Sequence, residues 1–186
     1  MAELPLPDPP LADDLVALRP WRSSDVPKKL MAFADPLVDR FVWRRLEPYT
    51  ESDAADFLER TRTARRRGSE LHLALVLADD TTDVLGGISL NDVDLDQRRA
   101  GIGYWVASEW RGRGIATRAV RLLARWAFDE LALARLEISC GPDNFASQRV
   151  AERCGFVREG LLRAHLVHKG RRRDSVVFGL LPADLR

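Results

Sequence analysis

The residues best suited to chemistry lie in one short segment, Trp-Arg-Gly-Arg-Gly-Ile-Ala-Thr, at positions 110–117. A long amphipathic stretch follows, so the segment is predicted to start a helix. The first N–H groups of a helix have no intrahelical partners and carry partial positive charge, and they therefore attract anions. Gly112 and Gly114 lack side chains that would keep a phosphate away from the backbone, and Arg111 and Arg113 add positive charge. The segment predicts a pyrophosphate-binding turn.

Two common phosphate loops are excluded by the residues present. A Walker loop ends in Gly-Lys-Ser/Thr, which is absent, and the dinucleotide fingerprint requires a third glycine where Thr117 stands. The remaining pattern, Arg111-X-X-Gly114-X-Ala116, resembles the acyl-coenzyme A motif, Gln/Arg-X-X-Gly-X-Gly/Ala, of the GNAT superfamily of N-acyltransferases. The alternative interpretation is an ordinary strand-to-helix turn that contains glycine.

A second group of residues strengthens this resemblance. Strand-like residues 136–140 are followed by Asn144 and Ser147, and then by a helical stretch that ends near residues 154–156. This order resembles the Rim-type branch of GNAT enzymes, the ribosomal-protein N-acetyltransferases and their relatives. Near a helix start, Asn144 can offer its amide to the pantetheine amides, and Ser147 lies on the same face three residues later. The alternative is that both residues cap the helix.

The resemblance covers about residues 15–181 and implies an α/β (α+β) fold. In the GNAT fold, a mixed central sheet, here of about seven strands, is flanked by helices. The fourth and fifth strands, here residues 102–107 and 136–140, splay apart and hold acyl-coenzyme A in the gap. The backbone of the fourth strand would pair with the pantetheine arm as an added strand does. The residues implied to contact the coenzyme are Trp105, Val106, Ala107, Arg111, Gly112, Arg113, Gly114, Ile115, Ala116, Thr117, Asn144 and Ser147.

The reaction that the resemblance implies is direct attack of a primary amine on the thioester of an acyl-coenzyme A, with acetyl as the expected acyl group. The acceptor is a protein N-terminus or a small-molecule amine, and the sequence does not choose between them. The enzyme must present a neutral amine, stabilise the oxyanion and return a proton to the thiolate. The resemblance assigns the last step to Ser147, as a general acid or as a hydrogen-bond donor to the thiolate. Helix capping is the alternative role.

The general base is where the sequence departs from the resemblance. Relatives often carry glutamate at the position of Gly101, and this chain has no titrating side chain there. The base is left unassigned, with a water chain to bulk solvent as one alternative. The protein candidates are His72, Asp92, Asp94, Glu137 and His165. The missing glutamate also supports a second hypothesis, a catalytically weak module that binds or senses acyl-coenzyme A.

Composition bounds the other possibilities. The chain has 186 residues, 46% of them hydrophobic, and a formal net charge of +1. These values predict one globular domain over residues 1–186 and no dedicated nucleic-acid binding. Residues 1–14 are rich in proline and lack the pattern of a signal peptide, so we expect a loose N-terminal tail. No apolar run approaches ~18 residues, so we expect no membrane contact and a cytoplasmic protein, either monomer or homodimer.

Cysteine and arginine patterns add two expectations. Cys140 and Cys154 fall in expected core elements and fit no metal-ligand spacing, so we expect buried free thiols and no metal. The arginine triplets at 65–67 and 171–173 raise a third hypothesis, an RNA-associated factor. Such runs are more often solvated faces, and the near-neutral net charge argues against this hypothesis.

The expected elements order these residues along the chain. Strands are expected at residues 15–19, 71–78, 84–93, 102–107, 136–140, 156–163 and 175–181. Helices are expected from a cap at Ser24 to about residue 34, from 51 to the triplet at 65–67, from 115 to 129, and before residues 154–156. Turns are expected at 79–83 and 169–173, with a bulge at 86–87 and a loop at 43–50 whose Trp43, by the resemblance, lies along the acceptor cleft.

Overall fold

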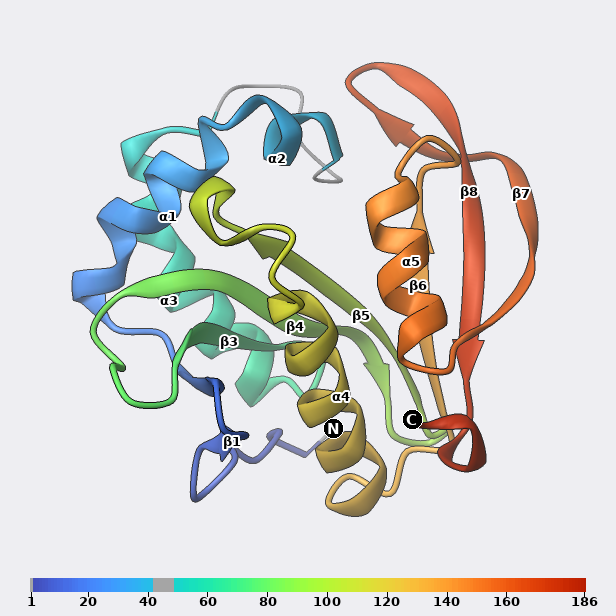
Figure 1. Ribbon diagram of the computed structural model, residues 1–186, viewed down its shortest axis with the longest axis horizontal. Helices are drawn as coiled ribbons and strands as arrows, with labels where there is room; N and C mark the ends of the chain where they lie inside the picture. The colour runs from blue at the N-terminus through green and yellow to red at the C-terminus, as the bar shows by residue number, and fades with distance from the viewer. Residues whose placement is uncertain (1, 42–48) are drawn as a thin grey trace.

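The computed structural model describes residues 2–41 and 49–186, which form a mixed sheet with helices on both faces (Figure 1). The strands are β1 (Leu11–Ala12), β2 (Val16–Pro20), β3 (Leu71–Leu77), β4 (Val84–Asp94), β5 (Arg99–Val106), β6 (Arg135–Cys140), β7 (Val157–His168) and β8 (Arg171–Leu180). The α-helices are α1 (Val26–Phe33), α2 (Pro36–Phe41), α3 (Glu51–Arg66), α4 (Ile115–Asp129) and α5 (Phe145–Arg153). Short 3₁₀ turns lie at Ser23–Asp25, Ser108–Trp110 and Pro182–Asp184.

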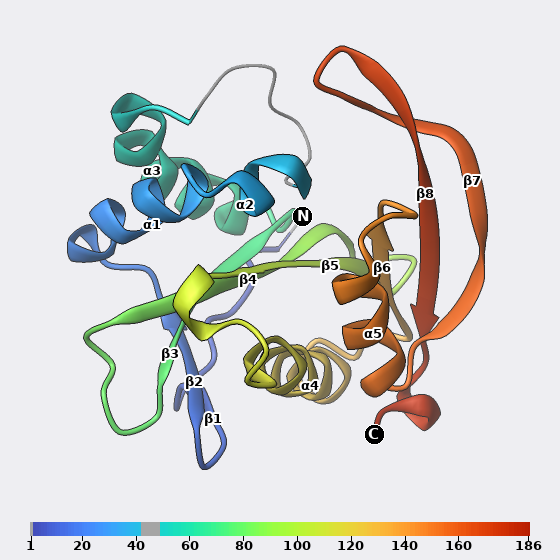
Figure 2. The same cartoon turned by 45° about the horizontal axis from the view of Figure 1, so that its top comes forward.

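The order of the eight strands in the sheet is β1-β2-β3-β4-β5-β6-β8-β7. In the described part of the chain, β5 and β6 are parallel and the other neighbouring pairs are antiparallel. Helices α1, α2 and α3 cover one face of the sheet, and α4 and α5 cover the other (Figure 2). This mixed sheet with helices on both faces is the predicted GNAT architecture, with one strand more than the seven expected.

The parallel pair β5–β6 is short and then opens. Register pairs join Arg99 to Arg135, Ala100 to Leu136 and Gly101 to Glu137, and none follows. Both strands continue beyond that point, β5 to Val106 and β6 to Cys140. The predicted splay between these strands is therefore confirmed, and it begins immediately after Gly101.

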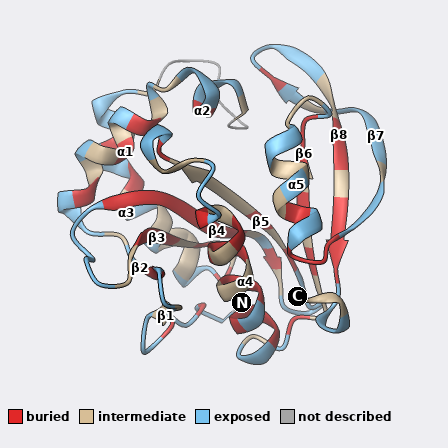
Figure 3. Ribbon diagram, viewed as in Figure 1, coloured by how far each residue is buried: buried red, intermediate tan, exposed pale blue. Residues whose placement is uncertain are grey.

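A continuous hydrophobic core fixes the sheet against α4. The strands carry most of the buried positions, while the outer faces of the helices are exposed (Figure 3). Ile115, Leu123 and Ala127 of α4 pack in the same cluster as Leu73 of β3 and Leu136 of β6. Because α4 packs across strands on both sides of the gap, its first turn is held at the mouth of the splay.

The N-terminal segment differs from the loose tail that we predicted. Leu4 is fully buried, and its C=O accepts a hydrogen bond of 2.7 Å from Arg65 Nη1. Residues 11–12 form β1, which pairs with β2. Asp13 accepts a bond of 2.8 Å from Arg118 at the start of α4. A proline-rich composition suggested disorder, whereas one buried leucine and two strand residues attach this segment to the sheet and to the helices.

Other expectations need local correction. The triplet at 171–173 begins β8 rather than lying in a turn, because the turn is confined to Lys169 and Gly170, both at positive φ. Helix α2 was not predicted, and α1 begins at Val26 after a 3₁₀ turn that contains Ser24. The bulge expected at residues 86–87 lies one residue earlier, at Leu85, because Gly86 pairs with Leu75 and Val84 pairs with Val76. Trp43 lies outside the described residues.

Candidate functional site

A cavity of about 1200 Å³ follows the gap between β5 and β6. The loop before α4 and the start of α5 line one end of it, at Gly114 and Ser147. Helices α1 and α3 line the other end, at Phe33 and Phe57. Since α4 and α5 cover one face of the sheet and α1 and α3 cover the other, the cavity crosses the plane of the sheet where the strands part.

The loop before α4 has the geometry of an anion site. Gly112 and Gly114 have φ of 76° and 79°, values that favour glycine. A Cβ built at either residue meets no atom within 4 Å, so both face open space. The first hydrogen bond of the helix runs from the Arg118 N–H to the Gly114 C=O at 3.1 Å. The N–H groups of residues 115–117 therefore precede the helical ladder at the mouth of the cavity.

Both arginines of this loop have partners within the protein. Arg111 donates from Nε to the Val106 C=O at 3.0 Å and from Nη2 to Asp35 at 2.8 Å, so it clamps the loop to the turn before α2. The guanidinium of Arg113 lies 5.0 Å from the ring of Trp110. Ile115 and Thr117 are buried, whereas Ala116 is half-buried. Any phosphate here would be held chiefly by backbone N–H groups.

The edge of β5 beyond Gly101 presents backbone to the gap. Trp105 and Val106 pair with β4 on the opposite side. The Ala107 N–H donates to the Leu85 C=O at 2.8 Å, so it too faces β4. Successive N–H groups along a strand point in opposite directions, so the N–H of Val106 points away from β4 and toward the gap. Of the three predicted backbone contacts, Val106 is thus the one placed to pair with an extended ligand.

Asn144, Ser147 and Tyr104 meet on the α5 side of the gap. Asn144 is the N-cap of α5, since its Oδ1 accepts a bond of 3.1 Å from the Ser147 N–H. The capping role weighed for Asn144 is therefore present. The Ser147 hydroxyl lies 2.9 Å from the Tyr104 hydroxyl. Burial raises the pKa of Tyr104, so its phenol keeps its proton at neutral pH. The sequence analysis missed Tyr104, whose role depends on a contact across 43 residues.

Comparison with known proteins identifies the family. The model for the acetyltransferase (GNAT) domain matches residues 16–157. The chain belongs to the GNAT family. A putative ribosomal N-acetyltransferase of Bacillus subtilis (strain 168) is 45% identical over 99 residues, which cover 53% of this chain and 54% of that relative. The match thus spans about half the length of that relative. An uncharacterized N-acetyltransferase of Bacillus licheniformis is 29% identical over 175 residues, covering 94% of this chain and 97% of the relative.

Solved GNAT structures agree with this assignment. Mycobacterium smegmatis RimJ in complex with CoA-disulfide is 28% identical and aligns with a TM-score of 0.81, covering 91% of this chain and 83% of that one. A putative ribosomal-protein-serine acetyltransferase from Vibrio cholerae shares the fold, with a TM-score of 0.81 at 24% identity, over 96% of this chain and 100% of that one. These relatives support the Rim-type branch that the sequence predicted.

The candidate bases of this GNAT chain occupy different surroundings. Asp94 accepts a bond of 2.9 Å from the Gln97 N–H in an exposed turn. Glu137 accepts a bond of 2.8 Å from Arg135. Asp92 and His165 line the cavity.

His72 also lines the cavity. Of the two candidate histidines, only His72 has its ring bonded to a carboxylate in the described residues. Its Nε2 lies 2.7 Å from Glu70 Oε2. The sequence indicated His72 as a candidate base, but it indicated neither Glu70 nor this pairing.

The far end of the cavity holds a buried cation that the sequence analysis missed. Lys29 of α1 is only 5% exposed, and its Nζ lies 4.0 Å from the ring centroid of Phe57 and 4.2 Å from that of Phe33. Three more aromatic rings lie within 5.8 Å of this Nζ, those of Trp21, Tyr49 and Trp105. The packing of α1 against α3 encloses the lysine, so no local sequence pattern marks it.

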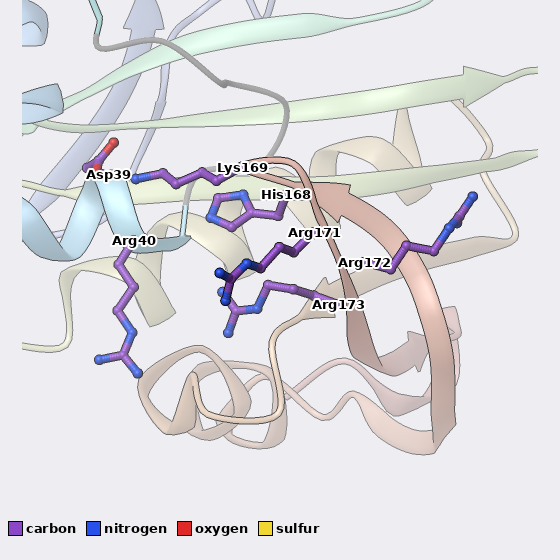
Figure 4. A pocket seen from close by; sticks show the side chains of 7 residues that line it. All are labelled: Asp39, Arg40, His168, Lys169, Arg171, Arg172 and Arg173. Atoms are coloured by element: carbon purple, nitrogen blue, oxygen red, sulfur yellow. Dashed lines mark hydrogen bonds and ion pairs between the residues drawn. The ribbon is translucent and has the colours of Figure 1, made fainter.

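A smaller hollow of about 500 Å³ lies between α2 and the tip of the β7–β8 hairpin (Figure 4). Its lining, the hairpin basic surface, consists of Asp39, Arg40, His168, Lys169, Arg171, Arg172 and Arg173. Arg40 and Arg173 each donate to Asp143 at 2.7 Å, and Lys169 pairs with Asp39. The two carboxylates balance only part of the positive charge, because Asp143 is shared by two arginines.

The remaining expectations concern metals, membranes and thiols. Across residues 2–41 and 49–186, no group of three or more histidine, cysteine or acidic side chains is placed to hold a metal ion. In the same part of the chain, every helix is too short or too polar to cross a membrane. Cys140 and Cys154 are buried free thiols, and burial raises the pKa of Cys154 to about 11. Both thiols are therefore protonated at neutral pH.

Proposed function

We propose that this protein transfers an acetyl group from acetyl-coenzyme A to a primary amine. The observation that carries the proposal is the open glycine loop at the start of α4, placed at the mouth of a gap between two splayed parallel strands. The loop leaves room for a pyrophosphate, because open space lies where a Cβ of Gly112 or Gly114 would stand. Unpaired helix N–H groups and the helix dipole favour its negative charge.

The chain's own groups are suited to binding the thioester and to returning a proton to the thiolate. The backbone of Val106 faces the gap, where its N–H can pair with the pantetheine arm or with the thioester oxygen. Asn144 holds the first turn of α5 and so positions Ser147 at the cavity. Ser147 and Tyr104 together can relay to the departing thiolate the second proton that the amine gives up, since the Ser147 hydroxyl lies 2.9 Å from a phenol that stays neutral.

The names of similar proteins suggest two classes of amine acceptor. The names of two relatives refer to ribosomal proteins, and one solved neighbour of similar fold is a spermidine N-acetyltransferase. Protein N-terminal amines and small amines are accordingly the two acceptor classes to test. Acetyl is the acyl group proposed, because a solved neighbour of the same fold was studied in complex with acetyl-CoA.

Release of free thiol from acetyl-coenzyme A tests the proposal against its main alternative. The acceptor panel contains peptides with free N-termini, amino acids and polyamines, and mass spectrometry identifies the acetylated product. An active enzyme releases thiol only when both substrates are present. A protein that binds acetyl-coenzyme A with no thiol release from any amine is instead the catalytically weak binding module.

A further inference from the structure

A row of polar positions crosses the sheet on the face covered by α1 and α3. His72 of β3 lies directly opposite Ser89 of β4, which lies directly opposite Gly103 of β5. Residues opposite each other in antiparallel strands project from the same face, with Cβ atoms about 4.5–5.5 Å apart. Gly103 is two residues beyond Gly101, where β5 and β6 last pair. The row therefore leads from β3 to the gap that the acyl group would occupy.

His72 is held as an acid–base group is held in many enzymes. Its Nε2 lies 2.7 Å from Glu70 Oε2, and the two side chains are only 21% and 30% exposed. The residues are two apart on an extended segment, so their side chains share a face. With Glu70 accepting the Nε2 proton, Nδ1 keeps its lone pair and can accept another proton. The ring of Phe57 meets the imidazole edge-on at 5.8 Å and limits its rotation.

Ser89 lies between this histidine and the gap in the strand register. Its side chain is largely buried, and its hydroxyl donates to the Gly103 C=O at 3.4 Å, a long bond that is easily exchanged. A Cβ at Gly103 would lie 3.3 Å from Ser89 Oγ and 2.8 Å from Asn91 Nδ2. The absence of a side chain at Gly103 is thus what lets two polar groups of β4 reach the gap. Glu70, His72, Ser89, Asn91 and Gly103 all line the same cavity.

We infer that Glu70, His72 and Ser89 form the proton-accepting path of the transfer reaction, in place of the carboxylate that is absent at Gly101. This inference rests on the proposed function. An ammonium acceptor gives up two protons in all. One passes through Ser89 Oγ to His72 Nδ1 and then to solvent, and Glu70 stabilises the imidazolium. The amine nitrogen then bonds to the thioester carbon, the C–S bond breaks, and the second proton ends on sulfur.

The other charged groups around His72 leave this path clear. Lys29 of α1, Arg60 of α3, Asp92 of β4 and Arg99 of β5 line the cavity from the elements packed about it. In the described residues, none of the four hydrogen-bonds the imidazole, whose recorded bond is to Glu70. Glu137, on the far side of the gap, is paired with Arg135. Among these groups, His72 alone combines a carboxylate partner with a register position in line with the gap.

The test is the pH dependence of kcat/KM for acetyl transfer to the best amine of the panel. Wild type should show one rising inflection on the acid side of the profile. His72→Gln should lose that inflection and lower kcat about 10²-fold. Glu70→Gln should keep the inflection but move it to lower pH, because the imidazolium loses its counter-charge. Glu59→Gln, an exposed change on α3 outside the cavity lining, should leave the profile unchanged.

Binding and folding measurements make each outcome decisive. Calorimetry should give the same acetyl-coenzyme A affinity for wild type and His72→Gln, and Ser89→Ala should lower kcat with little change in the KM for acetyl-coenzyme A. An inflection that persists in His72→Gln overturns the inference while leaving the proposed function intact. If His72→Gln does not fold, an unmoved inflection in Glu70→Gln overturns it. Absence of thiol release by wild type with every amine refutes the proposed function and the inference with it.

Discussion

Tyr104 and Ser147 come from β5 and α5 and meet through hydroxyls 2.9 Å apart. A serine hydroxyl of ordinary acidity and a buried phenol are both poor acids, so neither is the final source of the proton. The pair can act as a relay: Ser147 passes its proton to sulfur, Tyr104 replaces it, and the second proton released by the amine returns to the phenol. Asn144 acts indirectly, because its side chain accepts the Ser147 N–H and so holds the backbone of Ser147 in place.

The first residue-scale prediction concerns this pair. Tyr104→Phe removes the second hydroxyl and leaves the ring packing, so kcat should fall about 10²-fold with little change in the KM for acetyl-coenzyme A. Ser147→Ala should lower kcat by a similar factor, and the double variant should fall little further, because the two groups act as a unit. Steady-state kinetics of the four proteins measure this. Fully additive losses would contradict a shared proton path.

At the scale of elements, one ion pair links the phosphate loop to the helices that cover the acceptor end. Arg111 in the loop before α4 pairs with Asp35, whose carboxylate also accepts N–H bonds from Leu37 and Val38 at the start of α2. The hydrogen bonds from Arg111 hold the pKa of Asp35 below its ordinary value. The contact therefore couples the two ends of the cavity through side chains that are only partly exposed.

The element-scale prediction is the pH dependence of this clamp. Because the pKa of Asp35 is lowered in the folded state, its stabilisation is complete above the unfolded pKa and disappears as pH falls through the lower, folded value. Asp35→Asn should therefore lower the free energy of unfolding by about 1 kcal/mol at pH 7, and this difference should shrink below about pH 4. Urea unfolding of both proteins at pH 7 and below about pH 4 measures the difference in the free energy of unfolding. Asp56→Asn, an exposed change on α3, is the matched control, and a difference that is constant with pH would contradict the clamp.

How much of the fold followed from sequence depended on the length and pattern of each element. Helix α4 has the predicted bounds, 115–129, because its apolar stripe continues over several turns. Two residues in β1 and six in α2 are too few to show a period. The tail was misjudged because one buried side chain, Leu4, outweighs a proline-rich composition.

The residues of the candidate site also differ in how far a local sequence pattern predicts them. The glycine loop and the segment that begins at Asn144 are continuous in sequence, so both could be recognised there. Tyr104 with Ser147, and His72 with Ser89, are contacts set by strand register and by helix packing. Register is fixed only when the sheet assembles, so no local pattern announces such pairs. Family resemblance predicted the splay, and the fold supplies the polar row beside it.

At the scale of the whole molecule, the cavity crosses the sheet, so one end of it lies on each face. The loop before α4 and the start of α5 line one end, and α1 and α3 line the other. Figure 2 shows these two sets of helices on opposite faces of the sheet. The proposed direct transfer needs both substrates bound at once, which two ends on opposite faces allow. The central question is whether acetyl-coenzyme A occupies the end beside α4.

Calorimetric titration of acetyl-coenzyme A into wild type and two glycine variants tests this claim most directly. Gly114 and Gly170 have similar φ, 79° and 74°, and both are exposed, so Gly114→Val and Gly170→Val should share a backbone strain of about 1–2 kcal/mol. Only the side chain at 114 would project into the proposed pyrophosphate site. Circular dichroism checks that both variants remain folded. The proposed site predicts that Gly170→Val binds acetyl-coenzyme A as wild type does and that Gly114→Val loses binding. Wild-type affinity in a folded Gly114→Val protein would contradict it.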